Sequence, residues 1–295
     1  MNLAPIVLFV YNRPEHTLRT LEALKENHLA DQSFLFVYSD GPKNDASIAD
    51  QEKISEVRRI LKIKNWCKEV NIIEDGTNKG LAKSIEKGVT EVVNKYGKVI
   101  VLEDDLITSK GFLEYMNKAL DVFERHFNVY AVTGHMFQLN YSSAHTILLP
   151  YISTWGWGTW KDKWKIFHNE MSEKDIIISS SELQKRFNLS DYNYISMLQN
   201  LKNSWGIKWY YNVFIRNGLS VFPSKTLVEN IGLDGSGTNC KVEFNETPRL
   251  ESSVSVDFVD TIDLKFWKLY LDHFTNRKRT IFQKIRGLYV SKNNE

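Results

Sequence analysis

The segment Pro5-Ile6-Val7-Leu8-Phe9-Val10-Tyr11-Asn12-Arg13-Pro14 sets the architecture of this chain. Its continuous apolar run, residues 6–10, is typical of a strand covered on both faces, as in a parallel sheet flanked by helices. Pro14 presets the backbone of a first helical turn. The leucines that follow at helical spacing are Leu18, Leu21 and Leu24. The segment therefore predicts a buried strand followed by an amphipathic helix.

The same alternation continues along the first half of the chain. Further strands are predicted at residues 34–39, 70–73, 99–102 and 129–132, with helical apolar spacing between them. Alternating strands and helices indicate an α/β fold with a mostly parallel sheet and helices on both faces. Right-handed crossovers place the first four strands side by side, with their C-terminal ends on one edge. Ligands of open α/β sheets bind at that edge. The polar residues predicted there are Asn12, Arg13, Ser39, Asp40, Glu74, Asp75, Glu103, Asp104 and Asp105.

The composition of the chain excludes several classes of protein. The 295 residues are 42% hydrophobic and 25% charged, which suits a protein with a sizeable core and excludes disordered and fibrous chains. The formal net charge of +2 gives no field that would recruit nucleic acid. The two cysteines, Cys67 and Cys240, suit a reducing compartment, and no apolar run is long enough for a membrane span. We therefore expect a cytoplasmic protein.

The acidic cluster Glu103-Asp104-Asp105 follows the predicted strand at residues 99–102. Three consecutive carboxylates repel one another, so a cation among them is favourable. Carboxylate oxygens suit Mg²⁺ or Mn²⁺, which commonly take one or two carboxylates together with substrate phosphates. The alternative is an exposed acidic turn at the start of the next helix.

Other polar residues on this edge each allow two interpretations. Asp40 could accept hydrogen bonds from a base or ribose, or form an Asx turn with the residues after it. The segment 78–84, with Lys79, Gly80 and Lys83, starts a helix that could bind a phosphate, or is a solvated first turn. Arg13 could pair with a phosphate or with Glu15.

The second half of the chain is rich in aromatic residues. Residues 151–164 contain four tryptophans, residues 176–200 have helical character, and residues 232–238 form a Gly-rich loop. We expect one catalytic domain at residues 1–260, divided into a nucleotide half (1–135) and an acceptor half (136–260). The tail, residues 261–295, is predicted to be helical, basic and aromatic. The predicted apolar stripe of the tail is Leu264, Trp267, Leu271 and Phe274. Two roles stay open for it, namely contact with an anionic membrane surface or packing on the catalytic domain.

Four ordered segments resemble the GT-A nucleotide-sugar glycosyltransferases. They are residues 5–14, Ser39-Asp40-Gly41, Asn78-Lys79-Gly80-Leu81-Ala82 and Leu102-Glu103-Asp104-Asp105-Leu106. Among these enzymes the chain is most similar to bacterial family 2-like sugar transferases and to N-acetylglucosaminyltransferase I, whose metal motif is also Glu-Asp-Asp. Segments 151–164 and 223–240 also resemble the bacterial members. The likeness spans about residues 5–240, and the tail lies outside it.

The resemblance implies a function and roles for individual residues. It implies transfer of a hexose or N-acetylhexosamine from a UDP-sugar to a glycan or lipid-linked glycan acceptor, in bacterial surface polysaccharide assembly at the inner face of the plasma membrane. Asp105 would bind Mn²⁺ or Mg²⁺ directly. Glu103 and the catalytic residue Asp104 would contact the sugar or ribose, or reach the metal through water. The implied nucleotide-sugar contacts are Tyr11, Asn12, Arg13, Asp40, Lys79, Gly80 and Lys83.

Two departures from the family leave the catalytic base unassigned. The stretch 205–209 has Gly206 and Ile207 where relatives often carry an acid, and Asn239 stands where relatives often have a histidine. Asp234 is our leading candidate for the base, although it could be only a turn residue. Its rivals are Glu229 and Asp162. Inversion is favoured over retention but is not settled.

Tryptophan rings can stack on the C–H faces of sugars, which suggests acceptor contacts. The candidate acceptor residues are Trp155, Trp157 and Trp205, with core packing as the alternative. For Trp160 and Trp164 core packing is the favoured interpretation. Two other functions are weighed against glycosyl transfer. A sugar-nucleotide nucleotidyltransferase would need a Gly-rich basic loop after the first strand, and a non-catalytic glycan-binding module would leave the acidic cluster without a role.

Overall fold

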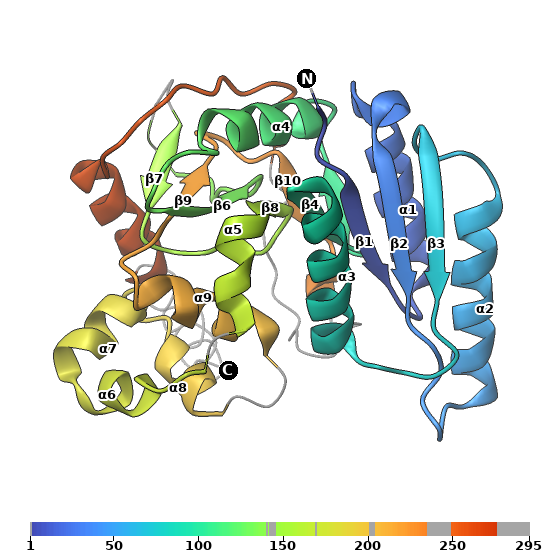
Figure 1. Cartoon of the computed structure of the whole chain (residues 1–295), viewed down its shortest axis with the longest axis horizontal. Helices are drawn as coiled ribbons and strands as arrows, with labels where there is room; N and C mark the ends of the chain where they lie inside the picture. Colours follow the sequence, from blue (N-terminus) through green and yellow to red (C-terminus); the bar gives the residue numbers. More distant parts are fainter. Residues whose placement is uncertain are drawn as a thin grey trace, which may run out of the picture.

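The computed structural model describes residues 2–139, 141, 146–168, 170–200, 204–234 and 249–275. An eight-stranded sheet forms the centre, in the order β3-β2-β1-β4-β8-β6-β9-β7, and β10 pairs with β5 beside it (Figure 1). The strands are β1 (Ile6–Val10), β2 (Phe34–Ser39), β3 (Glu69–Glu74), β4 (Lys98–Glu103), β5 (Leu106–Thr108), β6 (Val129–Thr133), β7 (Ile147–Leu149), β8 (Trp157–Trp160), β9 (Leu219–Phe222) and β10 (Val228–Asn230).

The four strands of the N-terminal half are parallel, as predicted. β1 pairs with β2 on one side and β4 on the other, and β2 pairs with β3. In this register Phe9 lies opposite both Tyr38 and Glu103. The strands therefore end together, and the residues that follow them meet at one edge of the sheet.

The C-terminal half extends the same sheet with mixed strand directions. β8 lies antiparallel between β4 and β6, so the two halves share one continuous sheet. Gly158 of β8 faces Ile100. A Cβ at Gly158 would lie 2.8 Å from the carbonyl oxygen of Val99, which explains a glycine at this close approach.

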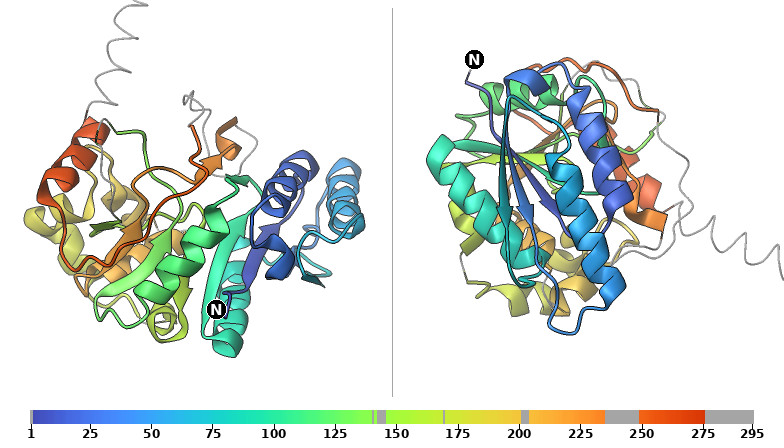
Figure 2. Two further views of the ribbon diagram at one scale, coloured as in Figure 1. Left: turned by 90° about the horizontal axis from the view of Figure 1, so that it is seen from above. Right: turned by 90° about the vertical axis from the view of Figure 1, so that its right-hand side faces the viewer.

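Helices cover both faces of the sheet, and alternate residues of β1 enter separate cores. Ile6, Leu8 and Val10 pack in the core with α1, α2 and α4, whereas Val7 and Phe9 pack in the core with α3 and α9. Figure 2 shows α1 and α2 on one side of the sheet and α3 on the other. The helices are α1 (Pro14–Lys25), α2 (Ile48–Lys62), α3 (Leu81–Tyr96), α4 (Phe112–Val122), α5 (Lys161–Trp164), α6 (Lys174–Ser179), α7 (Ser181–Phe187), α8 (Tyr194–Gln199) and α9 (Trp205–Phe214), with 3₁₀ turns η1 (Ala30–Gln32), η2 (Lys165–His168) and η3 (Gly232–Asp234). This arrangement confirms the predicted α/β fold.

The start of the tail packs on the domain. Residues 264–275 are helical, and the carboxylate of Asp263 accepts hydrogen bonds from the first amides of this helix, Lys265 at 2.9 Å and Phe266 at 3.1 Å. Phe266, Tyr270 and Phe274 are buried in a third core with β7 and β9 residues. These contacts favour packing on the catalytic domain for residues 264–275.

The predicted stripe of this helix was partly wrong. Leu264 is 73% exposed, because the cap at Asp263 sets a helical phase in which Phe266 and Tyr270 face the domain. Trp267 and Leu271 pack at the margin of that core. Residues 276–295 of the tail lie outside the described residues.

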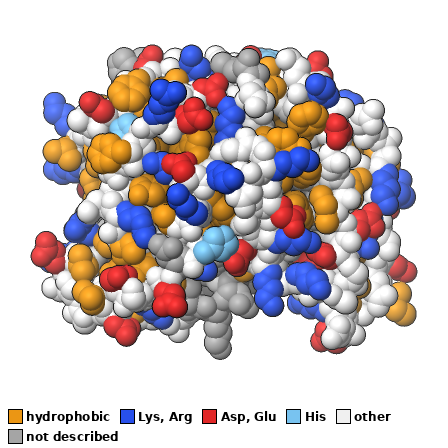
Figure 3. All heavy atoms as spheres, viewed as in Figure 1, with side chains coloured by type: hydrophobic (Ala, Val, Ile, Leu, Met, Phe, Trp, Pro, Cys, Tyr) orange, Lys and Arg blue, Asp and Glu red, His pale blue; other side chains and the backbone are white. Residues whose placement is uncertain are grey.

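On the face shown in Figure 3, basic and acidic side chains are interspersed, in keeping with the net charge of +2. Within the described ranges, no helix combines the length and the apolar character needed to cross a bilayer.

Candidate active site

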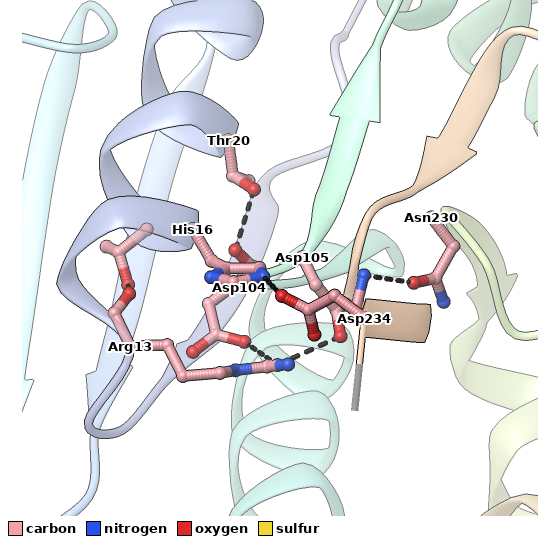
Figure 4. Close-up of polar contacts among 9 residues, drawn as sticks. Arg13, His16, Thr20, Asp104, Asp105, Asn230 and Asp234 are labelled. Carbon is pink, nitrogen blue, oxygen red and sulfur yellow. Dashed lines mark hydrogen bonds and ion pairs between the residues drawn. The ribbon is translucent and has the colours of Figure 1, made fainter. Parts of the chain in front are cut away.

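The ends of β1 and β4 bring Arg13, Asp104 and Asp105 together, as Figure 4 shows. Arg13 immediately precedes α1, and its carbonyl oxygen accepts from the amide of Thr17 at 2.9 Å and from the Thr17 hydroxyl at 2.8 Å. Asp104 and Asp105 fill the turn between β4 and β5. The strand register alone therefore places one cation against two carboxylates.

The guanidinium of Arg13 pairs with both aspartates. Its Nη2 atom donates to Asp104 Oδ1 and, at 2.9 Å, to Asp105 Oδ2. Burial alone would lower the pKa of Arg13, but the two carboxylates outweigh it and raise that pKa. The structure thus shows a partner for Arg13 that neither sequence interpretation, a phosphate or Glu15, had named.

Two carboxyl groups of this cluster, those of Glu103 and Asp104, have raised pKa values. Burial raises the pKa of Glu103 to about 8, with Asp105 and then Asp104 adding repulsion. Burial also raises the pKa of Asp104 to about 6, although Arg13 works in the opposite direction. A concentration of buried negative charge at a strand end is typical of a site that receives a cation.

The backbone around the cluster is fixed from two sides. The hydroxyl of Thr20, in α1, donates to the carbonyl of Asp104 at 2.8 Å. The carbonyl of Asp105 accepts from the amide of Ile231 at 2.9 Å, which joins the turn to the segment after β10. A Cβ at Gly232 would lie 2.1 Å from Asp105 Oδ2, so a larger residue would displace the carboxylate.

Asp234 reaches the same neighbourhood through η3. Its Oδ2 lies 3.2 Å from Nε2 of His16 in α1, and Figure 4 shows both side chains beside Asp104 and Asp105. Our sequence analysis missed His16. The available signal was its position three residues after Arg13, which places the two residues on one helical face.

The rival bases have other surroundings in the structure. Glu229 stands in β10 opposite Ile107, and burial raises its pKa. Asp162 lies in α5, where its carboxylate is 3.9 Å from the ammonium of Lys163. Of the three candidates, Asp234 is the one in the neighbourhood of the aspartate pair.

The carboxylate of Asp40 joins the turn after β2 to the segment that precedes α3. Its Oδ1 accepts from the amides of Gly41 at 2.9 Å and Lys79 at 2.8 Å, and its Oδ2 accepts from Gly80 at 2.9 Å. The side chain is buried. The amides of Lys79 and Gly80, which we had expected to hold a phosphate, are therefore occupied by a carboxylate of the protein itself.

The remaining nucleotide candidates surround this turn. Asn12 donates to Asp50 at 3.3 Å, and burial together with Asp50 raises the pKa of Tyr11. Lys79 and Lys83 have exposed side chains. A hollow of about 310 Å³ opens next to the turn. Its lining residues are Lys43, Asn44, Asp45 and Asn78.

Two of the three predicted acceptor tryptophans lie in the core. Trp157 is 1% exposed and stacks on Trp205, with their ring centroids 5.5 Å apart, so neither presents a face to a sugar. The Gly neighbours of Trp157 serve strand packing and not an open loop. Trp160 and Trp164 are buried, as expected. Trp155 is only partly buried and lies edge-on to His135 at 4.5 Å.

The donor set fits a divalent cation only in part. In the described ranges, no group of three or more His, Cys, Asp or Glu side chains is arranged to hold a metal. Asp104 and Asp105 supply the one or two hard carboxylates that Mg²⁺ and Mn²⁺ use when the other ligands are phosphates and water. The residues present therefore fit an ion that arrives together with a diphosphate.

Comparisons with known proteins identify the family of the chain. Residues 6–177 match the family described as "Glycosyl transferase family 2", a stretch that covers more than half of the chain and includes the acidic cluster. No curated protein matches the chain. Among solved structures, the chain is similar to TarS of S. aureus, with 14% identity, a TM-score of 0.41, and coverage of 77% of this chain and 36% of that one.

Proposed function

Because this chain belongs to glycosyl transferase family 2, we propose that it moves a hexose or N-acetylhexosamine from a UDP-sugar to a glycan or lipid-linked glycan acceptor, with Mn²⁺ or Mg²⁺ as cofactor. The observation that carries the proposal is the convergence of Arg13 with Asp104 and Asp105 at the ligand-binding edge of the sheet. Bacterial surface polysaccharide assembly is the setting that the sequence resemblance implies.

Asp105 is the proposed metal ligand. A divalent ion there would neutralise the charge that develops on the departing diphosphate. Asp104 and Glu103 are positioned beside it to contact the sugar or ribose. Burial raises the pKa of both carboxyl groups, although Arg13 works in the opposite direction, so a further cation would favour their ionised forms.

Asp234 is the proposed base. Its side chain is 47% exposed, so an acceptor hydroxyl can approach the carboxylate. The Oδ2 atom lies 3.2 Å from Nε2 of His16, which holds the carboxylate in place. The hydroxyl proton would pass to this carboxylate as the acceptor oxygen attacks the sugar carbon and the diphosphate leaves. Inversion at that carbon is the outcome consistent with a single direct displacement.

The nucleotide and acceptor are assigned to opposite sides of the aspartate pair. The turn at Asp40 and the hollow next to it offer polar groups for a base and ribose. Asn12 and Tyr11 lie at the end of β1 on that side. Trp155 remains the proposed platform for the acceptor sugar, because it alone of the three candidates is partly exposed.

Replacement of Asp105 tests the proposal. The Asp105→Asn variant should lose Mn²⁺-dependent release of UDP from its donor sugar by about a thousandfold, since it removes the charged ligand that stabilises the leaving group. A panel of UDP-sugars with and without Mn²⁺ measures this. The matched control is Asp121→Asn, a surface aspartate of α4 that pairs with Lys98. Unchanged turnover by Asp105→Asn would refute the metal site.

A further inference from the structure

Arg13 contacts the same carboxylates that the proposed metal ion would bind, so the two cations would compete for them. Its Nη2 atom contacts one oxygen of each aspartate, and these are the oxygens that face each other across the site (Figure 4). The Arg13 side chain is 19% exposed and those of Asp104 and Asp105 are 6% and 13% exposed. In the free protein, a cation supplied by the chain itself therefore compensates the buried carboxylates.

The other terminal nitrogen of Arg13 has a different status. Nη1 is buried and has no hydrogen-bond partner among the described residues. A guanidinium offers five donors in a rigid fork, a geometry that matches the oxygens of a phosphate. A buried donor without a partner is costly, so Nη1 indicates that this arrangement is completed by a ligand.

We propose that Arg13 is a placeholder cation: it holds Asp104 and Asp105 together until the divalent ion binds, the ion displaces it, and the released guanidinium then binds the diphosphate of the nucleotide. This inference rests on the proposed function. Two cations that share the same carboxylate oxygens repel each other, so the aspartates bind either the ion or Arg13 strongly. Binding of the ion thereby makes Arg13 available to the nucleotide.

The exchange predicts opposite effects of one substitution. The Arg13→Gln variant removes the competitor, so Mn²⁺ alone should bind about tenfold more tightly than to the wild type. The same variant lacks the phosphate ligand, so UDP in saturating Mn²⁺ should bind about tenfold more weakly. A salt bridge that only supports the fold would not strengthen metal binding when it is removed.

Titration with Mn²⁺, followed by the electron paramagnetic resonance signal of the free ion, measures the first effect, and calorimetry with UDP measures the second. The matched control is Arg59→Gln. Arg59 lies in α2 and pairs with Glu56 at 2.6 Å, away from the aspartate pair. Both of its affinities should equal those of the wild type.

Arg13→Lys provides a second variant in case Arg13→Gln does not fold. A lysine keeps the positive charge but is a compact ammonium without the guanidinium fork, so its Mn²⁺ affinity should stay near that of the wild type while UDP binding falls. Unchanged or weaker Mn²⁺ binding by Arg13→Gln, or unchanged UDP binding by Arg13→Lys, overturns the exchange. If the wild type itself binds no UDP with Mn²⁺, the proposed function fails instead, and the inference falls with it.

Discussion

The two halves of the sheet differ in what their strands present. The parallel strands β1 to β4 end in charged residues, and Arg13, Asp40, Asp104 and Asp105 all follow them. The mixed strands β6 to β9 and their helices enclose aromatic rings, including the Trp157–Trp205 stack and the Trp164–Phe167 stack at 4.4 Å. The chain therefore places the groups proposed for the metal and the nucleotide at the end of the parallel half, and it uses its aromatic excess mainly for packing in the other half.

The largest expected effect is on the free energy of unfolding, and it distinguishes tryptophans that pack in the core from one that could bind a sugar. Trp157→Ala should lower the free energy of unfolding by about 3–5 kcal/mol, because it empties a fully buried site. Trp155→Ala should lower it by only about 1 kcal/mol, because that side chain is partly exposed. Urea denaturation measures both. Equal losses would show that Trp155 is also a core residue and would remove the acceptor proposal.

A smaller effect is expected where the two halves meet at Gly232. Gly232→Ala places a methyl group against Asp105 Oδ2, so the carboxylate must move and the affinity for Mn²⁺ in the presence of UDP should fall about 10–100-fold. Calorimetry measures this affinity. The control is Gly76→Ala, where a Cβ meets nothing within 4 Å. If both variants bind alike, the approach of η3 to Asp105 is irrelevant to the site.

The smallest expected effect is on the melting temperature and comes from the ionisation of Glu103, at the end of the parallel strand β4. Glu103 has a pKa raised to about 8, mainly by burial, against an ordinary value of 4.5. A carboxyl group whose pKa is higher in the folded than in the unfolded protein stabilises the fold at a pH below the unfolded value. That contribution is lost as the pH rises through the folded pKa of about 8. In metal-free protein, Glu103→Gln should therefore raise the Tm at pH 8.5 relative to the wild type.

The expected size of this change is a few degrees, since about 1 kcal/mol moves the Tm of a domain of this size by about 2–4 °C. At pH 4.5 the two proteins should melt within a degree of each other, because Glu103 is then protonated in the folded state. Differential scanning calorimetry with EDTA present makes the comparison. A constant difference across this range would mean that Glu103 is ionised throughout in the folded protein.

The fold class could be predicted from the sequence because the local spacing of apolar residues distinguishes strands from helices. Continuous apolar runs such as residues 6–10, alternating with helical spacing, were enough to predict a mostly parallel sheet with its first four strands side by side. The segment 176–200 was less predictable. Its helical character was correct, but it divides into the short helices α6, α7 and α8, whose ends depend on caps such as Ser180 and Asn193.

The candidate site was predictable only as a set of residue types. The sequence placed Arg13, Asp40 and the acidic cluster on one edge, since the ends of parallel strands coincide. It could not show that Arg13 turns toward Asp104 and Asp105, because a pairing across 91 residues depends on strand register. Burial of Trp157 and Trp205 depended in the same way on which residues pack opposite them.

The carboxylate of Asp40 changes how strongly the N-terminus of α3 can attract an anion. By accepting from the amides of Lys79 and Gly80, it fixes a negative charge at the positive end of the α3 dipole. A diphosphate gains little attraction from that helix, in contrast to sites where a helix terminus faces the phosphate directly. For the proposed nucleotide, the candidate phosphate contacts on this side are therefore the exposed side chains of Lys79 and Lys83, and not the amides that precede α3.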